Sequence, residues 1–265
     1  MKRSKIRLDK LLSSLGYCSR KEVASLLRSG IITHTDNLYL KSDTKVAHDE
    51  IRFDNEPLDP PSKMVILMHK PVGFVCSHDN GEGRLIYDLL PERWRRRNPQ
   101  ISTVGRLDKE TSGLLLLTDD GALLHHLTSP KHKVPKIYEA TLDRPLKGDE
   151  GSIFASGTLM LNGEKTPCLP AKLEVIDPTH VKLEIIEGRY HQVRRMFAAV
   201  GNHVSALHRS SFGALTLGDL KEGEYRMLDI DGGDVFEFVS PPDEGEQFVS
   251  TECQRQLAIW NKPWE

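Results

Sequence analysis

A proline-rich segment divides this chain into two parts. Residues 55–62 read NEPLDPPS, with three prolines in eight positions. Proline fixes its own φ angle and has no amide N–H, so the segment cannot continue a helix or a central strand. We therefore expect a small unit at residues 1–54, a linker at 55–62, a larger unit at 63–240 and a C-terminal extension at 241–265.

The small unit is predicted to begin with two short helices. Residues 8–15 carry leucine at i, i+3, i+4 and i+7, the spacing of one helical face, and Gly16 follows as a stop. Ser19 and Glu22 have the spacing of a capping box for a second helix, which Gly30 would end. Short β-prone pieces come next, so the unit mixes helices and strands.

The larger unit is dominated by strand-like runs. They begin with MVILMHK after the prolines and continue to ALTL at residues 214–217. Helical patterns are clearest at Ala122–Thr128 and Tyr190–Val200, and the second has one apolar face suited to core packing. Antiparallel strands with a few helices packed on them predict an α+β domain with a mostly antiparallel sheet.

Charge is distributed unevenly along the chain, although the formal total is only -2. Residues 1–53 hold 11 basic and 6 acidic side chains, whereas residues 229–265 hold 2 and 9. Such asymmetry indicates a nucleic-acid-facing end and an acidic tail. The basic excess on the predicted helical pair fits either a phosphate-binding face or a solvated surface, and includes Lys10, Arg20, Lys21 and Arg28.

Several classes of protein are disfavoured by the sequence. No apolar run exceeds five residues, whereas a membrane span needs roughly 20, and no secretory signal is recognisable, so we expect a cytoplasmic protein. The four cysteines are widely spaced, and His125, His126 and His132 lack a neighbouring cysteine or carboxylate. No Gly-rich nucleotide loop is present. We therefore expect neither a metal nor a cofactor.

Three sequence motifs in the larger unit resemble those of a known family. An Arg-x-Asp such as Arg106–Asp108 is by itself typical of a surface ion pair. The whole string GRLDKETSGLLLLTDDG (105–121), however, resembles the signature of the RsuA/RluB branch of pseudouridine synthases. EGRYHQVRRM (187–196) resembles the Glu-Gly-Arg motif of that branch, and KIY (136–138) its Lys-x-Tyr strand. Residues 7–46 resemble the RNA-binding domain first described in ribosomal protein S4.

The resemblance implies both a fold and a reaction. The fold would be an S4-like domain joined to a mixed, mostly antiparallel sheet with a central cleft. The reaction would isomerise a ribosomal RNA uridine to pseudouridine, with Asp108 attacking at C1′ or acting at C2′. Arg189 would pair with Asp108, because a buried carboxylate needs a cation to stay charged. Tyr138 would lie against the uracil and assist proton removal from C5.

RNA contacts are implied around the same motifs. A uridine within folded RNA has to be extruded first, and Arg106 is the expected wedge or phosphate clamp. Further contacts implied at the catalytic unit are Lys136, Arg194, Arg195 and Arg209. A basic loop at residues 93–97 and the stretch 131–133 are weaker candidates, and a solvated loop is equally consistent with residues 93–97.

The expected partner is ribosomal RNA, within a partly assembled small subunit, and the protein is expected to act as a monomer without membrane contact. FAAVGNHVSALHR (197–209) is most similar to the subgroup that modifies small-subunit (16S) RNA. Large-subunit (23S) RNA is the alternative substrate. Two readings of another class also remain open: an RNA-binding assembly factor without this chemistry, and a metal-dependent phosphate hydrolase that uses Asp108.

Overall fold

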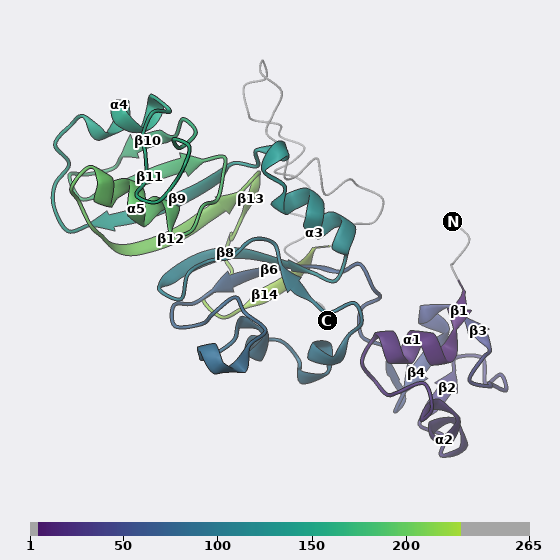
Figure 1. Ribbon diagram of the computed structural model, residues 1–265. Helices are drawn as coiled ribbons and strands as arrows, with labels where there is room; N and C mark the ends of the chain where they lie inside the picture. The colour runs from purple at the N-terminus through teal and green to yellow at the C-terminus, as the bar shows by residue number, and fades with distance from the viewer. Residues whose placement is uncertain (1–4, 229–265) are drawn as a thin grey trace, which may run out of the picture.

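The computed structural model describes residues 5–228, so the expected extension at 241–265 lies outside the described residues. Figure 1 shows a small unit at the N-terminal end of the chain and a larger one built around a sheet. Among the described residues, no helix is long and apolar enough to cross a membrane.

The small unit has a leucine core of its own. Leu8, Leu11, Leu12 and Leu15 are all at most 4% exposed, which confirms the predicted helical face. Gly16 follows at a φ of 84°, a left-handed conformation that suits glycine. The elements are β1 (Ile6–Arg7), α1 (Leu8–Ser14), α2 (Val23–Arg28), β2 (Ile32–His34), β3 (Lys45–Val46), η1 (His48–Glu50), β4 (Ile51–Phe53) and β5 (Glu56–Pro57).

In the described part of the larger unit, nine strands form one sheet. Its strand order is β10-β11-β9-β12-β8-β6-β14, with β13 paired to β12 and β7 to β8. Among these nine strands, every pairing is antiparallel except that of β12 with β8, so the predicted mixed, mostly antiparallel α+β fold is confirmed. The strands are β6 (Val65–Lys70), β7 (Ser102–Thr103), β8 (Thr111–Thr118), β9 (Lys136–Leu142), β10 (Lys172–Val175), β11 (His180–Ile185), β12 (Val204–Phe212), β13 (Leu215–Thr216) and β14 (Tyr225–Leu228).

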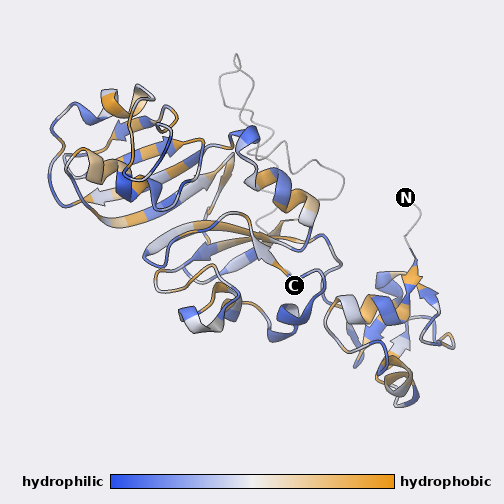
Figure 2. Ribbon diagram, viewed as in Figure 1, coloured by the Kyte–Doolittle hydropathy of each residue, from blue (hydrophilic) through white to orange (hydrophobic). Residues whose placement is uncertain are grey.

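Both faces of this sheet are covered where β6 and β8 lie. Alternate residues of β6 enter different cores: Ile66 and Met68 pack into one, and Val65 and Leu67 into the other. This alternation follows from the two-residue period of a strand, and it explains why β6 and β8 are apolar on both faces. Figure 2 shows the resulting run of hydrophobic residues along the central strands.

The helices flank different parts of the sheet. In Figure 1, α4 (Glu150–Ala155) and α5 (Gln192–Ala199) lie beside β9, β10 and β11, whereas α3 (Gly121–Thr128) lies near β8 and β13. The predicted helix at 122–128 is thus confirmed, and α4 was not predicted. Up to residue 228, the larger unit also has four short 3₁₀ helices: η2 (Asn80–Glu82), η3 (Ile86–Leu89), η4 (Glu92–Arg96) and η5 (Pro130–His132).

The basic loop at residues 93–97 joins the two units. Arg97 is buried and bonds to Asp119, with Nη2 to Oδ2 at 3.1 Å, and to the backbone carbonyls of Pro60 and Pro61. Arg93 donates to both carboxylate oxygens of Asp59, and its guanidinium lies 4.1 Å from the centroid of the Tyr17 ring. The sequence predicts RNA contact or a solvated loop for these residues. Arg93 and Arg97 instead fasten the proline-rich segment to the larger unit.

Candidate active site

A cavity of about 620 Å³ lies at the junction of β8 and β12, where the sheet has its parallel pairing. Its walls come from the loop before β8, the start of β9, the segment 185–193 and β12. Six residues singled out from the sequence line it, namely Arg106, Asp108, Lys136, Tyr138, Arg189 and Arg209. A smaller cavity of about 230 Å³, against Tyr87 and Trp94, contains none of them. The sequence motifs therefore converge on one place.

Asp108 is held in the loop that connects β7 to β8. The preceding Leu107 is 4% exposed and anchors the loop in the core, and the carbonyl of Asp108 accepts a hydrogen bond from Thr111 N at 3.0 Å. The carboxylate remains 29% exposed toward the cavity. Nε2 of His191 lies 3.3 Å from Asp108 Oδ1. The sequence had not singled out His191, which caps α5 in a left-handed conformation with φ 49°.

Two cations hold the backbone of the Asp108 loop. Lys70, at the end of β6, is fully buried, and its Nζ donates to Thr111 O at 2.8 Å and to Lys109 O at 3.4 Å. Burial lowers the pKa of Lys70, and nearby anionic groups that include Asp108 act in the opposite direction. Nη2 of Arg194 donates to Glu110 O at 3.0 Å. These cations hold the three backbone carbonyls that follow Asp108, and of the two only Arg194 is singled out by the sequence.

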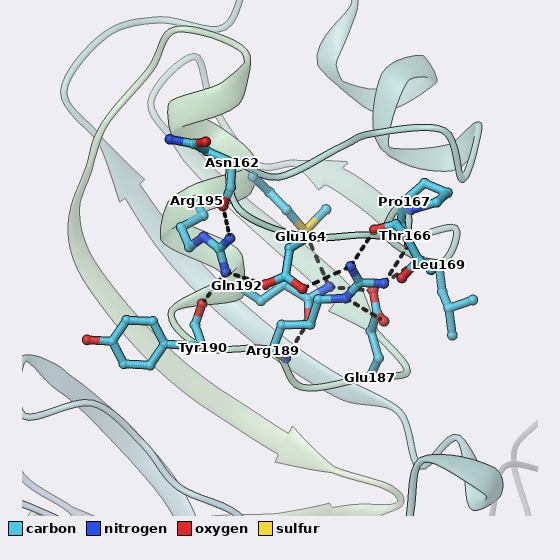
Figure 3. A network of polar contacts seen from close by, with 11 residues as sticks. Asn162, Glu164, Thr166, Pro167, Leu169, Glu187, Arg189, Tyr190, Gln192 and Arg195 are labelled. Carbon is cyan, nitrogen blue, oxygen red and sulfur yellow. Dashed lines mark hydrogen bonds and ion pairs between the residues drawn. The ribbon is translucent and has the colours of Figure 1, made fainter.

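The expected pairing of Arg189 with Asp108 is not what the structure shows. Figure 3 shows the Arg189 guanidinium turned into a separate network, where Nε donates to Glu187 Oε2 at 3.1 Å. Its two terminal nitrogens donate to the carbonyls of Thr166 and Pro167. The side chain is only 16% exposed, and all three of its nitrogens are engaged. The prediction was wrong because Glu187 and the loop carbonyls satisfy this arginine.

Arg195, for which the resemblance implies an RNA contact, also belongs to this network. Nη1 donates to Glu164 Oε1 at 2.9 Å and to Tyr190 O at 2.9 Å, and Nη2 donates to Asn162 O at 2.6 Å. Gln192 adds a bond from Nε2 to Glu187 Oε1 at 2.7 Å. The network thus fastens the loop at 162–169 to the start of α5, beside the cavity.

Tyr138, Arg209 and Lys136 form the floor of the cavity. Tyr138 is 8% exposed and Arg209 is 2% exposed. Arg209 Nη1 lies 3.5 Å from the Tyr138 hydroxyl oxygen, and Nε donates to Leu114 O at 2.7 Å. The Arg209 guanidinium and the Lys136 ammonium both lie about 5.4 Å from the centroid of the Phe212 ring. Burial, reinforced by Arg209, lowers the pKa of Lys136 to about 8.

Gly113 explains how Arg209 reaches this position. It lies opposite Arg209 in the parallel pairing of β8 with β12. A Cβ atom at position 113 would lie 2.3 Å from the carbonyl oxygen of Arg209, and the φ of Gly113 is 115°. Only glycine allows the two backbones to approach this closely, so the Gly of the GRLDKETSG motif determines where Arg209 sits.

The rim of the cavity is open and aromatic. Tyr190 is 75% exposed, and its ring stacks on that of His191 at a centroid distance of 3.8 Å and an interplanar angle of 18°. Arg106 is also exposed at this rim. Away from the cavity, the basic residues singled out on the small unit, Lys10, Arg20, Lys21 and Arg28, are all exposed. Within residues 5–228, no group of three or more His, Cys, Asp or Glu side chains is arranged as metal ligands.

Comparisons with known proteins agree with this geometry. The family model of RNA pseudouridylate synthase matches residues 64–199. Ribosomal small subunit pseudouridine synthase A of Vibrio cholerae is 43% identical over 225 residues, which cover 84% of this chain and 96% of that protein. Its Escherichia coli K12 namesake is 40% identical, with the same coverage. A crystal structure of a pseudouridylate synthase has 38% sequence identity and a TM-score of 0.59, and covers 84% of this chain and 96% of its own. The chain belongs to the RNA pseudouridylate synthase family.

Proposed function

We propose that this protein converts a uridine of small-subunit ribosomal RNA to pseudouridine, with Asp108 acting on the ribose. The observation that carries the proposal is the cavity at the β8–β12 junction, which holds Asp108 together with Tyr138 and buried cations. Relatives about 40% identical over most of their length are named as small-subunit pseudouridine synthases, which supports this choice of RNA.

The residues around Asp108 fit the chemistry at C1′. Breaking the C1′–N1 bond makes the ribose carbon electron-deficient, and the carboxylate of Asp108 can form an ester with it or remove the C2′ proton. His191, 3.3 Å from Oδ1, orients the carboxylate at the cavity wall. Lys70 and Arg194 hold the loop carbonyls, so the carboxylate is positioned before the substrate arrives. In this account Arg189 is a positioning residue that holds the 162–169 loop through its carbonyl contacts.

After the uracil has turned, C5 bonds to C1′ and then has to lose its proton. Tyr138 lines the cavity, and its hydroxyl oxygen faces Arg209 at 3.5 Å. We assign Tyr138 to contact with the ring and to this proton transfer. The uridine reaches the cavity by extrusion from the RNA, and the exposed Arg106 at the rim fills the space that the base vacates.

We further propose that residues 1–54 are an S4-like RNA-binding domain, that residues 55–62 link it to a catalytic domain at 63–240, and that 241–265 form an acidic extension. The exposed Lys10, Arg20, Lys21 and Arg28 would contact phosphates and position the RNA, whereas base extrusion would provide selectivity. The proposed substrate is a partly assembled small subunit, on which the protein acts as a monomer in the cytoplasm.

The experiment is to treat unmodified small-subunit and large-subunit RNA with the protein and to map pseudouridine in each. We expect product in the small-subunit RNA with the parent and none with Asp108→Asn. Asp88→Asn, which changes an exposed carboxylate outside the cavity, is the matched control and should stay active. Pseudouridine formed only in large-subunit RNA would show that large-subunit RNA, and not small-subunit RNA, is the substrate. No product in naked RNA or in assembly intermediates would favour the non-catalytic assembly factor, and loss of activity in EDTA would favour metal-dependent chemistry.

A further inference from the structure

The floor of the cavity carries more positive charge than its neighbours neutralise. Arg209 is 2% exposed and has no carboxylate within ion-pair distance among residues 5–228. Its Nη2 has no hydrogen-bond partner in the described part of the chain. A buried guanidinium normally satisfies all its donors and faces an anion. An incompletely satisfied one in the wall of a binding cavity indicates that a ligand supplies the missing acceptor.

Lys136 adds a second cation to the same floor. Its Nζ donates to the carbonyl of Val134 at 2.7 Å and shares the Phe212 ring with Arg209. Burial and the repulsion from Arg209 lower the pKa of Lys136 to about 8, and only Glu187 acts in the opposite direction. The positive charges of Arg209 and Lys136 repel each other, and an anion placed between them would relieve that repulsion.

The proposed reaction produces such an anion. When the C1′–N1 bond breaks, the bonding electron pair stays on N1, and the uracil carries one negative charge spread over N1, O2 and O4. Asp108 loses its own charge in the same step, because it either forms the ester at C1′ or takes the C2′ proton. One negative charge therefore moves from Asp108 to the ring by either route, and no external reagent is needed.

We propose that Arg209 and Lys136 form a cationic floor that binds the uracil ring in its detached, negatively charged state. This inference rests on the proposed function. Arg209 Nη2 is closed to solvent in the structure, and a small shift of the side chain on ring binding lets it donate to a ring oxygen. Lys136 stabilises the charge from the adjacent position on Phe212. The charge is absent from the bound uridine and present after bond cleavage, so the floor lowers the barrier instead of tightening RNA binding. It also keeps the ring in the cavity while the ring turns.

Single-turnover kinetics test this role. With saturating enzyme, Arg209→Met should slow pseudouridine formation about 10²-fold, the usual effect of removing one donor to a developing anion. Arg209→Lys should recover part of that loss, and Lys136→Met should slow the reaction about tenfold. Affinity for the RNA, measured separately, should change less than about threefold. Lys172→Met, which removes an exposed cation on β10 outside the cavity, is the control for net charge. Weaker RNA binding with an unchanged saturated rate would overturn the proposal and make Arg209 a phosphate contact.

A binding measurement tests the floor without catalysis. Barbiturate, an anion at neutral pH, resembles the detached uracil ring, and neutral uracil is its matched comparison. In Asp108→Asn the side chain is uncharged, as it is after bond cleavage, so this variant should bind barbiturate more tightly than uracil in ligand-observed NMR. Adding Arg209→Met should abolish that preference. Equal binding of barbiturate and uracil to Asp108→Asn would refute the claim that the cationic floor binds an anionic ring.

The two proposals can fail separately. If the parent makes no pseudouridine in any ribosomal RNA, the proposed function fails, and the NMR titration still decides whether the floor holds an anionic ring. Circular dichroism checks the fold of each variant. Arg209 also bonds to Leu114 O, so Arg209→Met could fail to fold. In that case Lys136→Met is the variant that tests the cationic floor. An unchanged rate and an unchanged ring preference in Lys136→Met would then overturn the inference.

Discussion

Replacing Arg97 by methionine should release the proline-rich segment from the larger unit, because Arg97 joins Pro60 and Pro61 to Asp119. The Arg97 and Asp119 side chains are 0% and 1% exposed, so Arg97→Met would leave a buried carboxylate without its cation. Breaking a buried pair in this way costs about 3–5 kcal/mol of the free energy of unfolding. The neighbouring Arg96 pairs with Glu92 at 2.8 Å, but these side chains are 67% and 76% exposed. Arg96→Met should therefore cost no more than about 0.5 kcal/mol.

Urea denaturation followed by circular dichroism measures both costs. We expect Arg97→Met to lower the unfolding free energy by about 4 kcal/mol and to speed proteolysis within residues 55–62, because the carbonyls of Pro60 and Pro61 lose their donor. The double variant Arg97→Met/Asp119→Asn should recover part of the loss, since no unpaired buried carboxylate remains. Equal costs for Arg97→Met and Arg96→Met would refute the argument that this contact is a buried clamp.

Three further predictions concern the cavity. Because the pKa of Lys136 is lowered to about 8, its ammonium is present below that pH and lost above it. The single-turnover rate should therefore fall as pH rises through about 8, and Lys136→Arg should remove that fall; an identical profile in both proteins would rule out Lys136 as its source. Tyr190→Ala should weaken RNA binding about tenfold in a filter-binding assay, whereas Tyr190→Phe should not, because a base can stack on either ring; equal losses would exclude stacking. Gly113→Ala should cost about 3 kcal/mol in urea denaturation, since its Cβ would meet the Arg209 backbone, while Gly121→Ala, with no atom within 4 Å, should change stability by under about 1 kcal/mol; similar values for both would contradict the close approach.

Hydrophobic periodicity predicted the parts of the fold that depend on local sequence. The leucines of α1 and the apolar runs of β6 and β8 are buried as expected, because each pattern matches the period of its element. The start of α5 was placed two residues early. Tyr190 continues the apolar spacing, but His191 takes a left-handed conformation with φ 49°, so the helix begins at Gln192. Spacing alone carries no information on that backbone reversal.

The site was predictable as a set of residues but not as a set of contacts. Asp108 and Tyr138 line one cavity, as the motifs implied. Arg189 could not be paired correctly, because its partners include carbonyls at residues 166 and 167, whose approach depends on a loop fixed by tertiary packing. The sequence does contain a signal for Lys70, since a lysine that ends an apolar strand must either reach solvent or find hydrogen-bond acceptors inside the protein. We had treated it as part of the strand.

The most direct test of the central claim is to map pseudouridine in ribosomal RNA from cells that lack this protein. We predict that one small-subunit position loses its pseudouridine, that the parent chain restores it and that Asp108→Asn, produced at the same level, does not. An unchanged small-subunit RNA, or restoration by Asp108→Asn, would contradict the claim that Asp108 in this cavity isomerises that uridine.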